Sequence, residues 1–551
     1  MAKKLAAPAL ICILILAVAL RIWGIGWGLP TTGHYFSYHP DETMVLFAAL
    51  KVNLFSGDLN PGFYNYGSLF VYLINIATVA ATASGAINLP PDDVFSRISE
   101  FAKLYMAGRV AAVLLGILTV YLVYALGRRA YGRAAGLLAA LFMAILPIHV
   151  MHSKFVAVDV PATFFVVLAL LFAIRITDGH RLRDYIFAGL FAGLAAGTKY
   201  NAGLVALSPI IAHFASDKAK PLLRIVNPKL LGIIIATAAG FLIGAPGALL
   251  YRDAFTKDFL YEVHHAQTGH GLLFTNTGSG FVYHITHSLW PGMGLPLLVL
   301  AGIGLLYAIK RRSAADLAML VFLVAYYAVI GMAQVRFARY TIPILPVLVL
   351  LAARVSADLM RRLLSGREIA RSFGVITMLV VILVSGYTLV YSLSIDRISA
   401  SADTRDRAAD WIRRSVPLHS SIGLPTIPWF YTPPVDPYFG LVNPSDRYDR
   451  VCDFTDYDLV VSRYTEWDAG FLQREAPGYV VLSEFEYEDR LRIGDPSARE
   501  YFDVLKRDYH LVRRFTDSPS LFGLKIPLVP ELPHDMSYVS PTILIYERKA
   551  G

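Results

Sequence analysis

The sequence predicts a polytopic α-helical membrane protein that carries an α/β domain at its C-terminal end. Of its 551 residues, 56% are hydrophobic and only 17% are charged, and the mean hydropathy is +0.52. A soluble globular chain is less apolar than this. Apolar runs near bilayer length recur through residues 1–395, as expected of transmembrane helices. From about residue 396, charged residues, Tyr, Asp and Pro become frequent, which indicates a separate external domain over residues 396–551.

Length and apolar character predict about eleven transmembrane helices. The first follows Lys3 and Lys4 and lacks a clear cleavage site, so we interpret it as an uncleaved anchor. In the fifth, Gly189, Gly193 and Gly197 recur at four-residue spacing and predict close helix packing. The spans are expected near residues 6–27, 104–126, 133–151, 160–178, 184–198, 201–215, 230–250, 293–310, 316–334, 340–358 and 372–394.

Basic residues fall on alternate connections between these spans. Because cytoplasmic loops carry the excess of Lys and Arg, these connections and the N-terminus are expected in the cytoplasm, and the C-terminal domain outside an inner or plasma membrane. The surplus of 50 basic over 41 acidic residues is therefore a sign of topology and not of nucleic-acid binding. The clusters are Lys3 and Lys4; Arg128, Arg129 and Arg133; Arg175, Arg181 and Arg183; Lys218, Lys220, Arg224 and Lys229; Lys310, Arg311 and Arg312; and Arg354, Arg361, Arg362 and Arg367.

Two long segments then face the external side. The first, residues 28–103, contains an apolar stretch at 67–87 that is long enough to span. Counting that stretch as a span would turn the basic cluster at 128–133 outward, so we interpret it as interfacial or re-entrant. The second segment, residues 251–292, is rich in His and aromatic residues. In the C-terminal domain, helix-like stretches at 402–414 and 499–508 alternate with apolar runs at 459–461 and 543–545 that predict strands.

The most informative stretch is Tyr38-His39-Pro40-Asp41-Glu42, which follows the first span. Proline suits the first position of a helix, and apolar residues continue at spacings of three and four, so we expect a helix to begin at Pro40. Asp41 and Glu42 then lie in its first turn, where the helix dipole favours their ionised form. They are available to bind a cation or to accept a proton from a hydroxyl, although acidic residues also suit a first turn without any catalytic role.

Further polar residues gather at the external ends of the spans, where charge near lipid is costly and tends to be kept for function. Cations there also snorkel to the interface, acids also suit helix starts, and histidines also occur on ordinary surfaces. Taken together, acids and cations at a membrane surface suit the transfer of a sugar from a lipid-linked phosphate. Cations would hold the leaving phosphate, and a carboxylate would deprotonate the acceptor hydroxyl. The set comprises Arg109, His152, Lys154, Asp159, Lys199, Tyr200, Arg336, Arg339 and Tyr340, with His264 and His265 in the second external segment.

Several motifs resemble the GT-C glycosyltransferases of the protein mannosyltransferase and aminoarabinose transferase kind. The resemblance covers roughly residues 1–395 and implies the GT-C fold and a polyprenyl- or dolichyl-phosphate-linked sugar as donor. It places the catalytic base on Asp41, a supporting role on Asp159, and contacts to the lipid phosphate on Lys199, Arg336 and Arg339. The motifs are Asp41-Glu42, His152-Ser153-Lys154 before Asp159-Val160-Pro161, Gly197-Thr198-Lys199-Tyr200, and Arg339-Tyr340 before Pro343 and Pro346.

We therefore expect Asp41, Glu42 and Asp159 to serve catalysis, and His39 and the other polar residues of the set to bind substrate. Some relatives that use diphosphate donors bind a divalent metal at such an acidic pair, so Asp41 and Glu42 are also candidate ligands of Mg²⁺ or Mn²⁺. Three sequence neighbours, with His39 as the third, rarely complete a metal site, however. A donor of β configuration would be inverted by a single displacement, for which one base suffices.

The acceptor is left open among proteins, glycans and lipids, and we expect the C-terminal domain to set its choice. That domain is similar to the external domains of many bacterial relatives and not to the β-trefoil of eukaryotic protein mannosyltransferases. A secondary transporter also has many spans and buried charge, but the charges here cluster at external helix ends and no inverted repeat is evident. A non-catalytic protein that binds lipid-linked glycans is the third reading.

Overall fold

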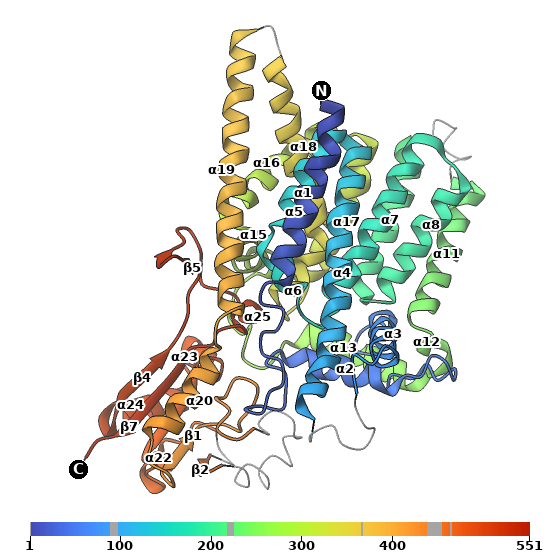
Figure 1. Cartoon of the computed structure of the whole chain (residues 1–551). Helices are drawn as coiled ribbons and strands as arrows, with labels where there is room; N and C mark the ends of the chain where they lie inside the picture. Colours follow the sequence, from blue (N-terminus) through green and yellow to red (C-terminus); the bar gives the residue numbers. More distant parts are fainter. Residues whose placement is uncertain are drawn as a thin grey trace.

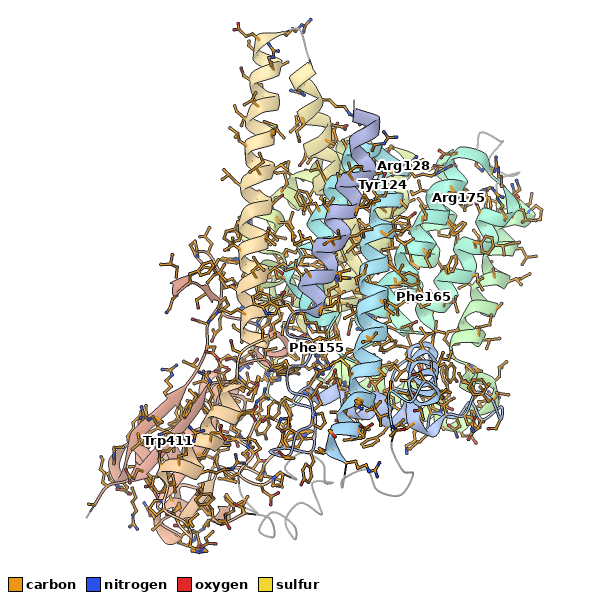
Figure 2. All side chains as sticks on the ribbon, in the orientation of Figure 1. Tyr124, Arg128, Phe155, Phe165, Arg175 and Trp411 are labelled. Carbon is orange, nitrogen blue, oxygen red and sulfur yellow. The ribbon has the colours of Figure 1, made fainter. Side chains whose placement is uncertain are left out.

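The structure, a computed structural model, describes residues 2–88, 97–216, 225–364, 367–437, 455–462 and 466–550. The predicted basic residues Lys218, Lys220 and Arg224 lie outside the described residues. Long helices form a bundle, and an α/β domain is attached at one end of it (Figure 1). Figure 2 shows Arg128 and Arg175 at the opposite end of the bundle from Trp411 of the α/β domain.

The helices of the bundle fall on the predicted spans. Some spans are interrupted where proline or a tight turn breaks the helix, since proline removes a backbone donor. The third predicted span divides at Pro147 into α5 and α6, and the tenth divides into η3, which contains Pro343, and α18. The elements are α1 Ala2–Ile22, α4 Ile98–Tyr131, α5 Arg133–Ala144, α6 Pro147–His152, α7 Asp159–Gly179, α8 Leu182–Ala196, η1 Tyr200–Ala206, α9 Leu207–Ser216, α11 Pro228–Gly244, α16 Leu295–Arg311, α17 Ala314–Met332, η3 Ala338–Ile344, α18 Leu345–Met360, η4 Arg361–Leu364 and α19 Glu368–Ser399.

Five helices in the described ranges are long and apolar enough to cross a membrane. A sixth span results if residues 280–293 and 295–311, which meet at 118°, are taken together. Four shorter apolar helices, α1, α3, α5 and α11, accompany them. The chain is thus an integral membrane protein, and the count of about eleven spans stays a prediction.

The predicted glycine stripe packs α8 against α11. Gly189 and Gly193 face the backbone of α11 between Ile233 and Phe241, and a Cβ atom on Gly197 would lie 2.7 Å from the Cα atom of Gly244. Such small residues let two helix backbones approach closely. The expected packing role of the stripe is confirmed.

Short helices lie across the end of the bundle that carries the α/β domain. The predicted helix at Pro40 is confirmed as α2, Pro40–Lys51, with Asp41 and Glu42 in its first turn. Figure 1 shows α2, α3 and α13 together at this end, below the long helices. The interfacial placement of residues 67–87 stays a prediction. The remaining elements here are α3 Leu69–Ala83, α12 Gly247–Leu250, α13 Arg252–Thr268, α14 Gly280–Tyr283, η2 His284–Leu289 and α15 Trp290–Met293.

The C-terminal domain contains a five-stranded mixed sheet in the order β2-β1-β3-β7-β4. β1 pairs in parallel with β2 and β3, whereas β7 pairs antiparallel with β3 and β4. The predicted helices at 402–414 and 499–508 and the predicted strands at 459–461 and 543–545 are present. The elements are α20 Thr404–Ser415, β1 Ser421–Leu424, β2 Asp458–Val461, α22 Ala469–Arg474, β3 Tyr479–Ser483, α23 Glu484–Ile493, α24 Pro496–Asp508, β4 Tyr509–Phe515, β5 Ser520–Leu521, β6 Leu524–Lys525, α25 His534–Ser537 and β7 Ile543–Arg548.

Candidate active site

A cavity of about 510 Å³ opens between the end of the bundle and the α/β domain. One wall comes from the start of α2, the loop at Tyr66, α13 with the loop that follows it, and η3. The opposite wall comes from the α/β domain. Aromatic and charged side chains alternate around it, so it has both the apolar surface and the convergent polar groups of a ligand site. Its lining includes Asp41, Tyr66, Glu262, His265, His270, Phe337, Arg339, Tyr340, Thr426, Trp429, Phe430, Tyr431, Glu466, Phe485, Glu486, Asp489, Arg490, His534 and Tyr538.

Asp41 stands at the cavity with 26% of its side chain exposed. The imidazole Nδ1 of His39 accepts the backbone N–H of Asp41 at 3.3 Å, which caps α2 and fixes the direction of its first turn. Burial alone would raise the pKa of Asp41, but the positive charges of Arg339 and its other neighbours lower it below the ordinary value. Asp41 is therefore a carboxylate at neutral pH.

Arg339 joins Asp41 to two further carboxylates. Its Nη2 lies 3.0 Å from Asp41 Oδ2, its Nε 4.0 Å from Asp159 Oδ2, and its Nη1 3.7 Å from Asp535 Oδ2. Among the described residues Nη1 has no hydrogen-bond partner, and the guanidinium lies 4.0 Å from the centre of the Phe337 ring. Within the described chain, the Nη1 group is thus buried beside Asp535 without a hydrogen bond of its own.

Lys199 completes the charged cluster. Its Nζ donates to Asp159 Oδ1 at 2.5 Å and lies 4.2 Å from the centre of the Tyr340 ring. Asp159 begins α7, so the helix dipole supports its negative charge. The structure therefore brings together the predicted residues Asp41, Asp159, Lys199, Arg339 and Tyr340.

Asp535 belongs to the same cluster but was not predicted. It lies in α25 of the α/β domain and is fully buried. Its Oδ1 accepts the backbone N–H of Ala338 at 3.0 Å and its Oδ2 that of Arg339 at 2.8 Å. Asp535 thus caps the start of η3, the element that carries Arg339, in the way a carboxylate caps a helix.

The α/β domain also holds the chain segment that leads to Asp41. The indole N–H of Trp27 donates to Asp403 Oδ2 at 2.9 Å, and the Tyr38 hydroxyl donates to Asp406 Oδ1 at 2.5 Å. The guanidinium of Arg405 lies 3.8 Å from the centre of the Tyr38 ring and donates to the carbonyl of Tyr538 at 2.7 Å. The approach to α2 and one wall of the cavity are therefore tied to the same buried arginine.

Glu42 faces away from the cavity, and its geometry does not fit the predicted catalytic or metal-binding role. Arg109 donates to it from Nε at 2.8 Å and from Nη2 at 2.6 Å, Val156 from its backbone N–H at 2.8 Å, and Ser37 from its hydroxyl at 2.5 Å. Burial would raise its pKa, but the charge and hydrogen bonds of Arg109 lower it. With four donors on two oxygens, Glu42 has no lone pair left for a metal or a substrate proton.

A metal site at the predicted acidic pair is therefore not supported by the donor atoms. Asp41 is paired with Arg339, and Glu42 is fully occupied. In the described parts of the chain, no group of three His, Cys, Asp or Glu side chains is arranged to hold a metal ion. The chemistry considered below accordingly uses only the chain's own groups.

Three predicted substrate-binding residues are engaged in internal bonds. Lys154 Nζ donates to Asp396 Oδ1 at 2.5 Å, and so ties the end of α6 to α19. The Tyr200 hydroxyl donates to the carbonyls of Tyr64 and Tyr66 at 2.6 and 3.0 Å. Arg336 Nη1 donates to Thr277 Oγ1 at 2.7 Å and to the Gly278 carbonyl at 2.8 Å. None of the three side chains lines the cavity, and each instead joins elements that surround it.

The predicted histidines divide between the cavity and its surroundings. His265 lines the cavity and bonds through Nε2 to His270 Nδ1 at 2.9 Å, whereas His264 lines a shallower adjoining pocket of about 300 Å³. His39 and His152 are buried, and both contact the ring of Phe155, which Figure 2 shows at the lower end of the bundle. Burial lowers the pKa of His39, so it is a neutral ring at physiological pH.

Comparisons with known proteins agree with this architecture. The sequence profile of the family described as dolichyl-phosphate-mannose-protein mannosyltransferase matches residues 95–243. This segment contains Asp159 and Lys199 of the charged cluster. No curated protein matches the chain in sequence.

Solved structures are similar to this chain over nearly its whole length. The oligosaccharyltransferase of Archaeoglobus fulgidus in its apo form has a TM-score of 0.52 at 16% identity, over 95% of this chain and 75% of that one. AglB from the same organism, in complex with an inhibitory peptide and a dolichol-phosphate, has a TM-score of 0.50 at 15% identity, with the same coverage. ArnT from Cupriavidus metallidurans bound to undecaprenyl phosphate has a TM-score of 0.47 at 13% identity, over 97% of both chains. Over residues 95–243 the chain is thus similar to this mannosyltransferase family, and over most of its length it shares the fold of the archaeal oligosaccharyltransferase.

Proposed function

We propose that this protein transfers a sugar from a polyprenyl-phosphate-linked donor to an acceptor hydroxyl, with inversion and with Asp41 as the base. The observation that carries the proposal is a partly exposed, ionised Asp41 beside Arg339 in a cavity at the end of the helix bundle. The family match and the fold shared with a dolichol-phosphate complex support a lipid-linked donor.

The donor phosphate is assigned to Arg339. Arg339 lines the cavity at the edge of the bundle, and its Nη2 lies 3.0 Å from the partly exposed Asp41. A guanidinium binds phosphate through paired N–H groups and stays charged at any physiological pH. Lys199 donates to Asp159 and neutralises the charge of that carboxylate. Asp159 therefore competes less with the donor phosphate for Arg339.

The reaction proceeds by a single displacement. The acceptor oxygen attacks the anomeric carbon, the bond between that carbon and the phosphate oxygen breaks, and the electron pair leaves with the polyprenyl phosphate. The hydroxyl proton passes to Asp41. Because the pKa of Asp41 is lowered, it is ready in the ionised form and takes the proton late, when the attacking oxygen has become acidic. Arg339 stabilises the charge that develops on the phosphate.

The orientation follows from the charge distribution. Arg128 and Arg175 lie at the bundle end opposite the cavity (Figure 2), and basic residues favour the cytoplasmic side. The N-terminus is then cytoplasmic, and the cavity and α/β domain face the external or periplasmic side of the membrane.

The test is donor consumption by membranes that contain the wild type, Asp41→Asn or Asp253→Asn. Asp253 is the matched control, because it is an exposed carboxylate in the first turn of α13 that does not line the cavity. Polyprenyl-phosphate sugars and native lipid extract are supplied, and each donor is followed by mass spectrometry. We expect the wild type and Asp253→Asn to consume one donor and Asp41→Asn to consume none. Equal consumption by all three would remove the base from Asp41.

Under either rival function, no variant would consume donor, and a further measurement distinguishes the two. A transporter would move a substrate across sealed vesicles without cleaving any donor. A protein that only binds lipid-linked glycans would retain the donor intact and would bind it equally with Asn at position 41.

A further inference from the structure

A short hairpin of the α/β domain exposes large apolar side chains to the surroundings. β5 and β6 pair antiparallel, Ser520 with Lys525 and Leu521 with Leu524. Phe522 at its tip is 93% exposed and Leu524 is 74% exposed, and Leu528 just beyond the hairpin is also exposed. A soluble surface rarely displays several large apolar side chains side by side. We define the apolar hairpin as residues 519–529.

The tip is also held in a demanding conformation. The two residues of the turn, Phe522 and Gly523, have φ of +51° and +81°. Such two-residue turns normally use Asn-Gly or Gly-Gly, because a bulky residue at positive φ is strained. The backbone of Phe522 is thus strained while its side chain is exposed. The side chain contributes no packing to the α/β domain. Strained residues of this kind tend to mark functional surfaces.

The apolar hairpin is hydrogen-bonded to α19 and α15 of the bundle. Arg397 donates to the carbonyl and the hydroxyl oxygen of Ser520, both at 2.9 Å. The Tyr387 hydroxyl donates to the Pro527 carbonyl at 2.8 Å, and the Trp290 indole donates to the Leu528 carbonyl at 3.1 Å. Since a helix rises 1.5 Å per residue, the anchors at 397 and 387 lie about 15 Å apart along α19. The segment therefore runs alongside the helix toward the bundle.

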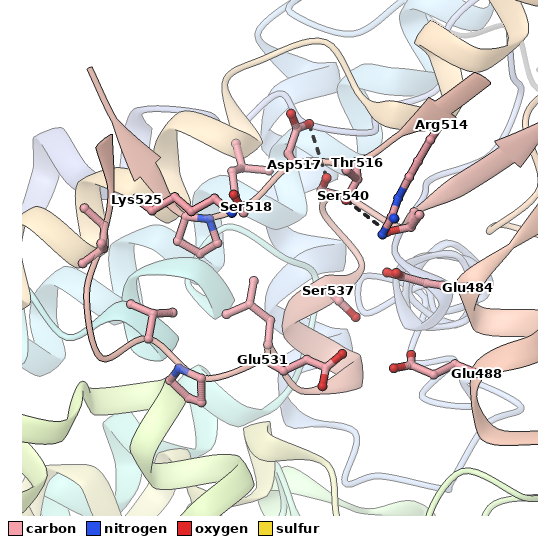
Figure 3. Close-up of a pocket in the computed structure, with 17 residues that line it drawn as sticks. Glu484, Glu488, Arg514, Thr516, Asp517, Ser518, Lys525, Glu531, Ser537 and Ser540 are labelled. Atoms are coloured by element: carbon pink, nitrogen blue, oxygen red, sulfur yellow. Dashed lines mark hydrogen bonds between the residues drawn. The ribbon is translucent and has the colours of Figure 1, made fainter. Parts of the chain in front are cut away.

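A polar pocket separates this segment from the sheet. It has a volume of about 410 Å³. Figure 3 shows Lys525 on one side of it and Glu484, Glu488 and Arg514 on the other. Ile526 and Val529 line this pocket and pack against the buried core, whereas Phe522, Leu524 and Leu528 do not line it and stay exposed.

The residue types at these contacts are those found at a bilayer interface. α19 belongs to a span whose apolar window is largely exposed on the bundle surface, so its outer face contacts lipid. Tyr and Trp, the residue types of the two inner anchors, are enriched where acyl chains meet headgroups. In Figure 1 the hairpin projects sideways from the lower part of α19, on the bundle side of the α/β domain.

We propose that the apolar hairpin inserts into the outer leaflet of the membrane and anchors the α/β domain over the cavity. Phe522, Leu524 and Leu528 enter the acyl region next to the lipid-facing surface of α19. Lys525 extends to the headgroups, as lysine does at membrane interfaces. This proposal is independent of the reaction catalysed, because it concerns the position of one hairpin relative to lipid.

The test is the depth of nitroxide labels on the full-length protein in nanodiscs. Single cysteines replace Phe522 or Leu524 in a background where Cys12 and Cys452 are serine. Phe522→Cys and Leu524→Cys are compared with Leu383→Cys on the exposed face of α19 and Leu418→Cys on the exposed surface of the α/β domain. Collisions with O₂, which concentrates in the bilayer, are measured against collisions with a water-soluble nickel chelate.

We expect the ratio of oxygen to nickel collisions at positions 522 and 524 to exceed that at 418 several-fold and to stay below that at 383, which lies at the middle of the predicted span. A ratio at 522 and 524 equal to that at 418 would place the hairpin in water and overturn the proposal. Protection from both reagents would overturn it as well, because a protein surface, such as a second copy of the chain, would then cover the hairpin. None of these outcomes depends on catalytic activity.

Discussion

Replacing Asp535 with alanine is expected to impair sugar transfer although this residue lies far from Asp41 in the sequence. Asp535 accepts the backbone N–H groups of Ala338 and Arg339 and lies 3.7 Å from the guanidinium of Arg339. It is thus a positioning residue for the cation that we assign to the donor phosphate. Its removal leaves two buried N–H groups without an acceptor and lets the start of η3 shift.

The size of the effect follows from the bonds that are lost. A hydrogen bond to a charged group contributes about 1.5 to 3 kcal/mol. We count the loss of one of the two hydrogen bonds, because structural relaxation or water will replace part of the other. Since 1.4 kcal/mol is tenfold in an equilibrium or a rate, the expected loss of kcat/KM is roughly 10- to 100-fold. Misplacement of a charged group by about 1 Å accounts for losses of the same size.

The assay is donor consumption in nanodiscs at low donor concentration, combined with the thermal unfolding midpoint of each variant. Asp535→Asn retains one acceptor oxygen and should lose less activity than Asp535→Ala. Asp410→Asn, an exposed acid in α20, is the control and should behave as the wild type. A folded Asp535→Ala protein with wild-type kcat/KM would refute the reasoning. So would an activity loss that is fully explained by a smaller folded fraction.

Three further predictions concern the first turn of α2 and its cation. Glu42→Gln leaves the buried Arg109 without a counter-charge and should destabilise the fold by about 3 to 5 kcal/mol. Its thermal unfolding midpoint should fall, whereas that of Asp41→Asn should stay nearly unchanged. Arg339→Gln removes the main charge that lowers the pKa of Asp41. Burial then raises that pKa, so the acidic limb of the pH profile of kcat/KM should move to higher pH. An unchanged acidic limb would show that another group titrates there. Chelation by EDTA should leave donor consumption unchanged because the lone pairs of Glu42 are occupied, and recovery of lost activity by Mg²⁺ or Mn²⁺ would contradict this.

Local patterns were sufficient to predict the elements that begin at prolines and the residues that stand at helix starts. Pro40 does begin α2, and Asp159 does begin α7. Asp159, Lys199 and Arg339, which the sequence grouped by sidedness and by the family resemblance, meet in one cluster with Asp41. Sidedness was informative because all of these residues lie at the same end of the bundle.

The different fates of Asp41 and Glu42 could not be predicted from their spacing. Neighbouring residues on a helix point about 100° apart, so one of the pair faces the cavity and the other faces α4. Which one does so depends on Arg109, which lies on α4 and forms the buried pair with Glu42. The same holds for Lys154, whose partner Asp396 lies at the far end of α19. Such pairings are set by tertiary packing and leave no periodic signal.

No sequence pattern indicated the role of Asp535. It lies two residues after Pro533, in the four-residue helix α25, and forms no spaced motif with the residues of the first external segment. Its role appears only when α25 is packed against η3. The expectation that the C-terminal domain sets acceptor choice remains a prediction. The domain also holds Arg339 in place through Asp535.

The contacts make the α/β domain part of the site itself. Arg405 stacks on Tyr38 before α2 and donates to Tyr538 on the far wall of the cavity, so one buried side chain fixes the distance between the proposed base and that wall. Asp535 fixes Arg339 from the same side. A chain that ends before residue 396 would retain Asp41 but lose the groups that orient Asp41 and Arg339. Its truncation should therefore abolish transfer to every acceptor, and a truncated protein that still consumed donor would show that the bundle alone orders the site.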